Sequence, residues 1–337
     1  MARKTTIIGI EATKAYETEK TGVGWYTFYI VQGLMEAIRP PHELRLYVNP
    51  ALLNPNPKIL NTEQCSNVTI QQLSWLPRKF WTQIRLSIEM LANPPDVLFI
   101  PAHLPPLIHP QKLVVTIHDL AFKQYPEVYS KKELLLQEWG IRRILKRAWR
   151  IIVPSQFTKD EIQKYYPRLA KDNIFVVPHG VNLETQNLKL KAQNHNVKLK
   201  ANIVYIGRLE SKKNIVNLIK AFDILKSYKL ILIGPRGYGY ETIRREIDAS
   251  PYKNNIHELG WIDREAMDNY LREAAVFVFP SLYEGFGMPL LEAMSSGTPV
   301  VVSNIPVFHE VGGDIPLYFD PHSPGDIAEK ISSMLQS

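Results

Sequence analysis

The sequence of 337 residues contains a single cysteine, Cys65, and no apolar run long enough to cross a bilayer. One cysteine cannot form an internal disulfide, so we expect a reducing, cytoplasmic location. The longest apolar runs, such as AAVFVF and PVVVS, have the length of buried strands, whereas a spanning helix needs about 20 apolar residues. The start, MARKTTIIGIEA, lacks a long apolar core and a small-residue cleavage site, so we expect no secretory signal there.

Several common catalytic patterns are missing as well. The sequence has no P-loop, no G-x-S-x-G elbow, no Cys/His cluster with zinc-like spacing and no G-x-G-x-x-G after an apolar strand. These absences argue against P-loop ATP hydrolysis, serine hydrolysis, a structural zinc and dinucleotide binding. We therefore expect neither a metal nor a cofactor.

Positive charge is unevenly distributed along the chain. Residues 1–180 contain 23 Lys or Arg and 15 Asp or Glu, a net charge of +8, and residues 181–337 contain 17 and 18, a net charge of −1. A basic half is typical of proteins that meet a membrane surface, a nucleic acid or a phosphorylated ligand. The length suits two domains of roughly 150–180 residues.

Both halves alternate short apolar runs with amphipathic runs, a pattern that predicts an α/β fold with parallel sheets covered on both faces. The segment 183–200, LETQNLKLKAQNHNVKLK, is polar and has no clear period. We predict an N-terminal domain over 1–182, a linker over 183–200 and a C-terminal domain over 201–337. Ligands of such sheets bind beyond the carboxyl ends of the strands.

The segment PSLYEGFGMPLLEAM, residues 280–294, carries two glutamates between a predicted strand and a predicted helix. Gly285 and Gly287 allow the backbone to approach a ligand closely, and Pro289 suits the first turn of a helix. Amides at that helix start favour a diphosphate. The alternative is an ordinary strand–turn–helix connection in which Glu292 is a helix-start acid. The length of the block favours a ligand site.

The segment IVYIGRLESKKNIVNLIKAF places Arg208 at a predicted strand end and Lys212 and Lys213 before the next helix. Cations so placed could bind an anionic ligand such as a phosphate. A solvated basic loop is the alternative for the lysines.

These two blocks, and the continuation SSGTPVVVSNIPVFHEVGGD, resemble the retaining nucleotide-sugar glycosyltransferases of family 4, which have the GT-B fold of two Rossmann-like domains facing a central cleft. The resemblance implies that Glu284 contacts the donor sugar, that Glu292 binds the ribose hydroxyls, and that Arg208 and Lys213 bind the diphosphate. Lys212 competes with Lys213 for this role. The substrate site would further include Gly285, Phe286, Gly287, Met288 and Leu290.

Two sites in the first half also resemble the family. VVTIHDLAF ends a predicted strand with His118 and Asp119, and the resemblance places this position near the sugar, although a structural histidine is equally plausible. Gly22 and Gly24 open a predicted helix where the family has a glycine-rich loop beside the donor phosphate and the acceptor. Trp25 stands where many members have arginine, so a phosphate role there would rest on backbone amides.

The segment KKELLLQEWGIRRILKRAWR predicts a basic, Trp-bearing helix, and WLPRKFWTQIR adds Phe80 and Trp81 beside Arg78 and Lys79. Such helices can lie on anionic membranes. The alternative is that the Leu and Trp face packs on the sheet and the cations are solvated.

The sequence therefore predicts an enzyme, a glycosyltransferase that moves a hexose, mannose or glucose, from GDP-mannose or a UDP-hexose to a glycan or lipid-linked hydroxyl with retention. We expect His118 to join Glu284, Arg208 and Lys213 in catalysis. Peripheral contact with an anionic membrane is an open expectation, and nucleic acid is not an expected partner. The alternatives are a nucleotide-sugar epimerase of the same architecture and a non-catalytic nucleotide-sugar or nucleic-acid binding module.

Overall fold

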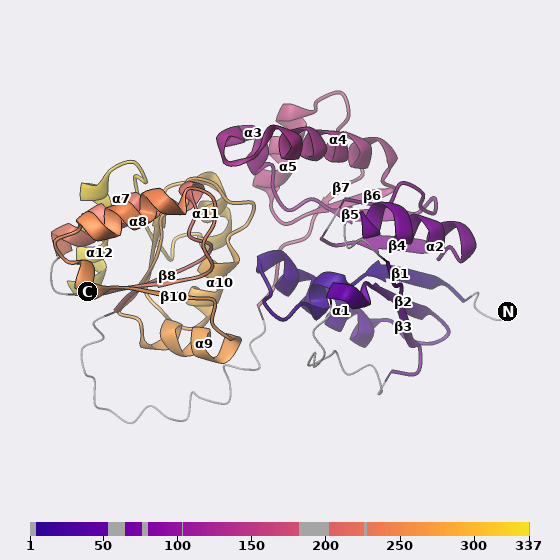
Figure 1. Ribbon diagram of the computed structural model, residues 1–337, viewed down its shortest axis with the longest axis horizontal. Helices are drawn as coiled ribbons and strands as arrows, with labels where there is room; N and C mark the ends of the chain where they lie inside the picture. Colours follow the sequence, from indigo (N-terminus) through magenta and orange to yellow (C-terminus); the bar gives the residue numbers. More distant parts are fainter. Residues whose placement is uncertain are drawn as a thin grey trace. The chain divides into compact units, whose positions relative to one another are not determined.

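The computed structural model describes residues 5–52, 65–75, 80–102, 104–181, 202–225 and 228–336 (Figure 1). The chain divides into two compact units. Unit 1 comprises Met1–Leu120, Lys131–Pro154 and Thr158–Val177. Unit 2 comprises Ala121–Ser130, Ser155–Phe157 and Pro178–Ser337. The predicted linker, 183–200, lies outside the described residues.

Unit 1 is built on a parallel sheet. In its described residues the strand order is β3-β2-β1-β4-β5-β6-β7. The strands are β1 (Ile7–Glu11), β2 (Glu43–Val48), β3 (Val68–Gln72), β4 (Val97–Ile100), β5 (Leu113–Thr116), β6 (Arg150–Val153) and β7 (Ile174–Val176). The order reverses between β1 and β4, which makes this the point where the sheet can hold a ligand.

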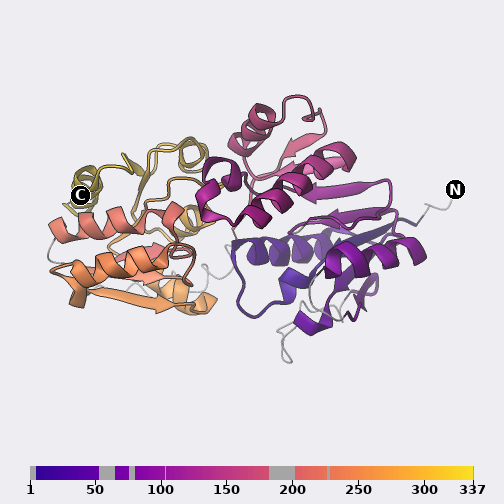
Figure 2. The ribbon, with the colours of Figure 1, turned by 45° about the horizontal axis from the view of Figure 1, so that its top comes forward.

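Helices connect these parallel strands (Figures 1 and 2). They are α1 (Gly22–Ala37), α2 (Leu86–Ala92), α4 (Lys131–Arg147) and α5 (Gln156–Tyr165), with a π-helical turn at Trp81–Arg85 before α2. The short α3 (Ala121–Gln124) belongs to unit 2. The connection from β1 to β2 crosses the sheet in one direction, and the connections from β3 to β4 and from β5 to β6 cross it in the opposite direction. Because such crossovers are right-handed, α2 and α4 share one face of the sheet and α1 covers the other.

Unit 2 has a second parallel sheet, with the order β10-β9-β8-β11-β12-β13 in the described residues. Its strands are β8 (Asn202–Ile206), β9 (Lys229–Ile233), β10 (Ile256–Gly260), β11 (Val276–Phe279), β12 (Val300–Ser303) and β13 (Leu317–Phe319). Its helices are α7 (Ile215–Leu225), α8 (Tyr240–Ala249), α9 (Arg264–Glu273), α10 (Met288–Ser295), α11 (Pro306–Gly312) and α12 (Pro324–Gln336). Every residue of β11 and β12 is buried, as a doubly covered sheet requires.

Candidate active site

The candidate site of unit 2 lies where the strand order reverses, between β8 and β11. Arg208 follows β8, and the loop that carries Glu284 follows β11. The carboxyl ends of these neighbouring strands meet at one edge of the sheet. The two blocks that the sequence singled out are therefore brought together by the sheet topology.

Glu284 and Lys213 form an ion pair at this edge. The ammonium of Lys213 contacts Oε1 of Glu284, and both side chains are largely buried, with exposed fractions of 13% and 14%. The Ser281 hydroxyl donates to the same carboxylate oxygen at 2.8 Å. The site thus holds one carboxylate and one cation in direct contact, each able to turn to a ligand.

The turn that carries Lys213 is held in place by Asn214. Asn214 has a left-handed backbone (φ 60°), and its side-chain amide donates to the carbonyl of Pro321 at 2.7 Å. The competing residue, Lys212, lies 3.6 Å from the carboxylate of Glu210. Lys213 is therefore the lysine that contacts Glu284.

Arg208 lies exposed after β8. Its carbonyl accepts a hydrogen bond from the hydroxyl of the buried Tyr205 at 3.1 Å. Among the residues that the structure describes, no carboxylate forms an ion pair with the Arg208 guanidinium. The backbone of β8 and that of β9 approach so closely here that a Cβ on Gly234 would lie 2.1 Å from the carbonyl oxygen of Gly207. Arg208 is thus a cation on a rigid strand end.

Glu292 is buried in α10 and is paired with an arginine that the sequence analysis missed. Arg264, the first residue of α9, contacts Oε1 of Glu292 and also lies 3.0 Å from Asp268. Burial raises the pKa of Glu292 above the ordinary glutamate value, and the charge of Arg264 opposes this rise. The predicted ribose acceptor therefore already has a cationic partner.

The start of α10 requires a glycine. Gly287 has φ 99°, and a Cβ there would lie 2.8 Å from the ring of Phe308. The amide of Leu290 donates to the carbonyl of Gly287 at 3.0 Å, and its side chain is buried. Among the residues described, the amides of Gly287 and Met288, just before Pro289, donate to no backbone carbonyl.

Other residues of unit 2 hold the loop that carries Glu284. The hydroxyl of Ser155 donates to the carbonyl of Gly285 at 2.6 Å. The ring of Tyr283 packs against Phe157, with 5.6 Å between centroids, and the ring of Phe286 packs against His179 at 4.8 Å. These contacts fix the backbone on both sides of the carboxylate.

The start of α5 is held by a carboxylate from a distant part of the chain. Glu310 accepts from the amides of Gln156 (2.6 Å) and Phe157 (3.0 Å), next to Ser155, which bonds to the loop of Glu284. A carboxylate at a helix start is favoured by the helix dipole.

The predicted residues of the first half lie in unit 1. Gly22 and Gly24 form the first turn of α1, and the Nε2 of His118 lies 2.7 Å from the carbonyl of Pro101. The His118 ring also packs edge-on against Tyr26, with 4.9 Å between centroids. His118 therefore has structural partners, and Asp119 follows it beyond the end of β5.

A second unpredicted cation lies at the glycine-rich loop. Lys20 places its ammonium 5.3 Å from the ring of Trp25 and donates to the carbonyl of Glu17 at 2.8 Å. Burial lowers the pKa of Lys20, while the charge of Glu17 opposes the decrease. Lys20 thus places a cation beside the ring of Trp25.

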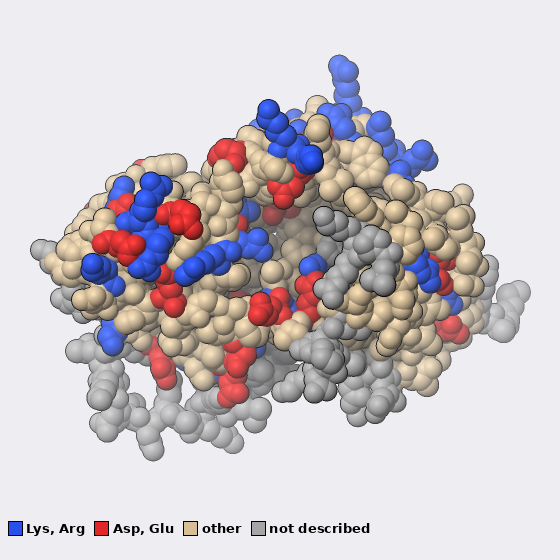
Figure 3. Space-filling model, in the orientation of Figure 1, with Lys and Arg blue, Asp and Glu red and all other residues tan. Residues whose placement is uncertain are grey.

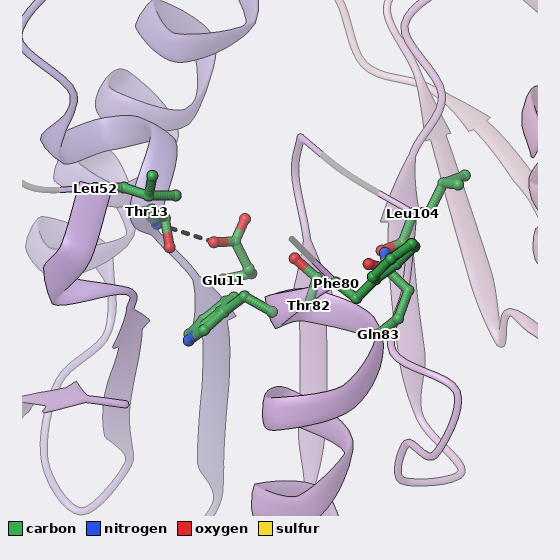
Figure 4. A pocket seen from close by; sticks show the side chains of 8 residues that line it. Glu11, Thr13, Leu52, Phe80, Thr82, Gln83 and Leu104 are labelled. Atoms are coloured by element: carbon green, nitrogen blue, oxygen red, sulfur yellow. Dashed lines mark hydrogen bonds between the residues drawn. The ribbon is translucent and has the colours of Figure 1, made fainter. Parts of the chain in front are cut away.

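A pocket of about 270 Å³ lies at the carboxyl ends of the unit 1 strands (Figure 4). Glu11 ends β1, and its Oε1 accepts from the amide of Thr13 at 3.1 Å. The full lining comprises Glu11, Thr13, Leu52, Phe80, Trp81, Thr82, Gln83 and Leu104. The volume lies just below the range of about 300–1,000 Å³ for small-molecule sites. Hydroxyl, amide, carboxylate and aromatic groups together suit a sugar ring.

The mouth of this pocket has an unusual backbone. Phe80 is a non-glycine residue with φ 61°, and it directly precedes the π-helical turn at Trp81–Arg85. Strained residues and π-helical turns are both frequent at binding sites. The Trp81 side chain itself is buried, and its indole donates to the carbonyl of Leu73 at 2.7 Å.

Within the described part of the chain, no group of three His, Cys, Asp or Glu side chains is arranged to hold a metal ion. No helix of that part is both long enough and apolar enough to span a membrane.

Comparison with known proteins agrees with this architecture. Residues 166–337 match the family model "Glycosyl transferases group 1", and residues 21–185 match "Glycosyltransferase Family 4". The chain is 28% identical to O-antigen chain mannosyltransferase B of Escherichia coli over 97% of this chain and 90% of that protein. It is 28% identical to O-antigen chain mannosyltransferase RfbU of Salmonella typhimurium over 78% of this chain and 70% of that protein.

Among solved structures, sucrose-phosphate synthase from Thermosynechococcus elongatus superposes with a TM-score of 0.74. The alignment is 20% identical and covers 98% of this chain and 90% of that chain. This likeness concerns the fold alone.

Proposed function

Because the chain belongs to the group 1 glycosyl transferases and has the GT-B fold, we propose that it transfers mannose from GDP-mannose to an acceptor hydroxyl with retention of configuration. The choice of mannose is supported by the two O-antigen mannosyltransferases to which it is similar over most of its length. UDP-glucose is the next candidate. The single observation that carries the proposal is the Lys213–Glu284 pair beside Arg208 at the reversal point of the unit 2 sheet.

In the proposed complex the donor lies against unit 2. Arg208 and Lys213 bind the diphosphate and stabilise the negative charge that develops as the sugar–phosphate bond breaks. The amides of Gly287 and Met288 add donors to the same phosphate. Glu284 accepts hydrogen bonds from the sugar hydroxyls, and Glu292, oriented by Arg264, accepts from the ribose.

The acceptor is proposed to bind unit 1. The pocket beside Glu11 offers a carboxylate and hydroxyls for sugar hydroxyls and an aromatic wall for the apolar face of a ring. The departing phosphate takes the acceptor proton, so the reaction needs no protein nucleophile. His118, which the sequence placed among the catalytic residues, is proposed to contact the sugar or the phosphate.

A thermal-shift panel tests the donor assignment. GDP-mannose, UDP-glucose, ADP-glucose and dTDP-glucose are added separately, and a ligand that binds the folded protein raises Tm. We expect GDP-mannose to give the largest increase. A panel in which no nucleotide sugar raises Tm contradicts the proposed function, and a larger increase with another sugar contradicts only the choice of GDP-mannose.

Substitution of Glu284 tests its role. We expect Glu284→Gln, which keeps the shape of the side chain, to lower the rate of transfer by about 100-fold or more, as loss of one preorganised transition-state contact does. Binding of GDP should persist, because the diphosphate contacts remain. Glu241→Ala, an exposed glutamate of α8, is the matched control and should transfer like the wild type. Undiminished transfer by Glu284→Gln would show that the assignment is wrong.

A further inference from the structure

Unit 1 exposes large apolar side chains on α2, on α4 and on the segments next to them. Leu135 in α4 and Leu91 in α2 are 72% and 65% exposed. Those in the segment 80–91, the loop 104–108 and α4 are Phe80, Ile84, Ile88, Leu91, Leu107, Ile108, Leu135, Leu136 and Trp139. Single exposed apolar residues are ordinary, but a contiguous group of this size marks an interaction surface.

These residues form one surface because α2 and α4 share a face of the sheet and the loop 104–108 lies between them. The guanidinium of Arg143 in α4 donates to the carbonyl of Leu107. On the other side of the loop, the amide of Ile108 donates to the hydroxyl of Ser87 in α2 at 3.2 Å. We call the exposed side of α2, the loop 104–108 and α4 the apolar–basic face.

The face is basic as well as apolar. The α4 segment contains six Lys or Arg and two Glu, a net charge of +4. Leu135, Trp139, Arg142 and Lys146 follow one another at spacings of three and four residues, so they share one side of the helix. The opposite side is buried and contains Gly140, Ile141, Ile144 and Leu145. Figure 3 shows Lys and Arg side chains gathered over the region of α4.

We propose that the apolar–basic face binds the surface of an anionic lipid bilayer. The leucine, isoleucine and tryptophan side chains would enter the interface, where apolar burial is favourable, and the cations of α4 would contact anionic headgroups. Neither contribution suffices alone, and stable anchoring takes two signals. This role is independent of the donor site and goes beyond the proposed transfer reaction.

The charge and the apolar side chains of the face together favour an anionic bilayer over a second copy of the chain or a nucleic acid. A symmetric dimer formed through this face would bring two copies of α4, each with a net charge of +4, close together, and like charges across an interface are unfavourable. Nucleic acid would satisfy the cations but not the exposed Leu135, Leu136 and Leu91. An anionic bilayer satisfies both kinds of side chain.

Sedimentation with vesicles tests the proposal. The full chain is mixed with vesicles of phosphatidylcholine alone or of phosphatidylcholine with one-quarter phosphatidylglycerol. We expect binding to the anionic vesicles, weak binding to the neutral ones, and loss of binding as salt is raised. Equal binding to both kinds of vesicle, or to neither, overturns the proposal.

Charge reversal on α4 locates the surface. Because each Lys or Arg near an anionic membrane contributes about 1 kcal/mol, we expect Lys146→Glu/Arg147→Glu to weaken binding by about tenfold or more. The matched control is Lys220→Glu/Arg245→Glu, which changes the charge by the same amount on exposed positions of α7 and α8 in unit 2. Unchanged vesicle binding by the α4 variant, or an equal loss in the control, overturns the assignment.

Substitution of single exposed leucines tests the contributions of α2 and α4 to membrane binding separately. We expect Leu135→Ser and Leu91→Ser each to weaken vesicle binding several-fold, and Ile315→Ser, an exposed position of unit 2, to have no effect. All variants should keep the far-UV circular dichroism and the cooperative thermal unfolding of the wild type, which shows that they are folded. A result in which Leu135→Ser leaves vesicle binding intact but converts a dimer to a monomer assigns the face to a second copy and overturns the proposal.

Discussion

Gly287 is the residue at which the loop of Glu284 turns into α10, and its backbone excludes other residue types. A side chain there must adopt φ 99° and would meet the Phe308 ring. We expect Gly287→Ala to lower the free energy of unfolding by more than the roughly 1–2 kcal/mol that a left-handed backbone alone costs. Urea unfolding measures the change.

Gly297 provides the comparison that separates strain from collision. It has φ 70°, and a Cβ there would meet nothing within 4 Å. Gly297→Ala should therefore show only the cost of the backbone conformation. Equal losses in the two variants would mean that Phe308 moves aside and that packing at Gly287 contributes nothing.

Glu292 allows a prediction about pH. Burial raises its pKa in the folded protein, so the fold favours the protonated carboxyl. The stabilisation from this group is complete below the unfolded pKa and is lost as the pH rises through the folded pKa. Glu292→Gln stays neutral, and Arg264 keeps Asp268 as a partner in that variant. Its stability relative to the wild type should therefore increase from pH 4 to pH 7.

The measurement is urea unfolding of both proteins at each pH. A stability difference that stays constant over this range would show that folding leaves the pKa of Glu292 unshifted, and one that moves toward the wild type with increasing pH would show that the Arg264 pair dominates and lowers the pKa.

The position of Glu292 also depends on the N-terminal cap of α9. The side chain of Asp263 accepts from the amide of Ala266 at 2.8 Å and so caps α9, whose first residue, Arg264, holds Glu292. Loss of a cap costs about 0.5–2 kcal/mol. We expect Asp263→Ala to lower stability by about 1 kcal/mol and to weaken nucleotide binding, whereas Asp263→Asn should retain most of both. Calorimetric titration with GDP would check this, and full affinity in Asp263→Ala would rule out a positioning role for the cap.

At the level of elements, the sequence predicted the buried strands and two of the edge strands, β7 and β10, but missed the other two edge strands, β3 and β13. The runs at β8, β9, β11 and β12 are continuous and apolar, and the structure confirms them. β3 and β13 lie at the edges of their sheets, and each has only one neighbouring strand. Their short sequences, VTIQQ and LYF, are only partly buried and do not form a recognisable apolar run.

Missed helices have two different causes. α2 carries apolar residues on its inner side, such as Met90, and on its exposed side, such as Leu91, so its sequence has no helical period. α12 does have signals that were available, with Pro324 in its first turn and buried Ile327 and Ile331 at helical spacing. Periodicity could not have predicted α2, whereas it could have predicted α12.

For the whole molecule, the sequence predicted the α/β architecture and the GT-B fold, and both are confirmed. It could not show which charges pair. The contacts of Lys213 with Glu284 and of Arg264 with Glu292 join residues 71 and 28 positions apart. Such pairs follow from strand order, not from local spacing. The membrane expectation named Trp81, which is buried, and Arg78 and Lys79, which lie outside the described residues.

The contact between Lys213 and Glu284 bears on how the reaction would end. A bare phosphate can reach the lysine only by breaking this pair, and it offers the carboxylate nothing in return. An intact donor bound as we propose offers a phosphate to Lys213 and a sugar hydroxyl to Glu284. Once the sugar has gone, the carboxylate is again without its hydroxyl and competes for the lysine. The ion pair between these two side chains would thus weaken the binding of inorganic phosphate and speed the release of the nucleotide product.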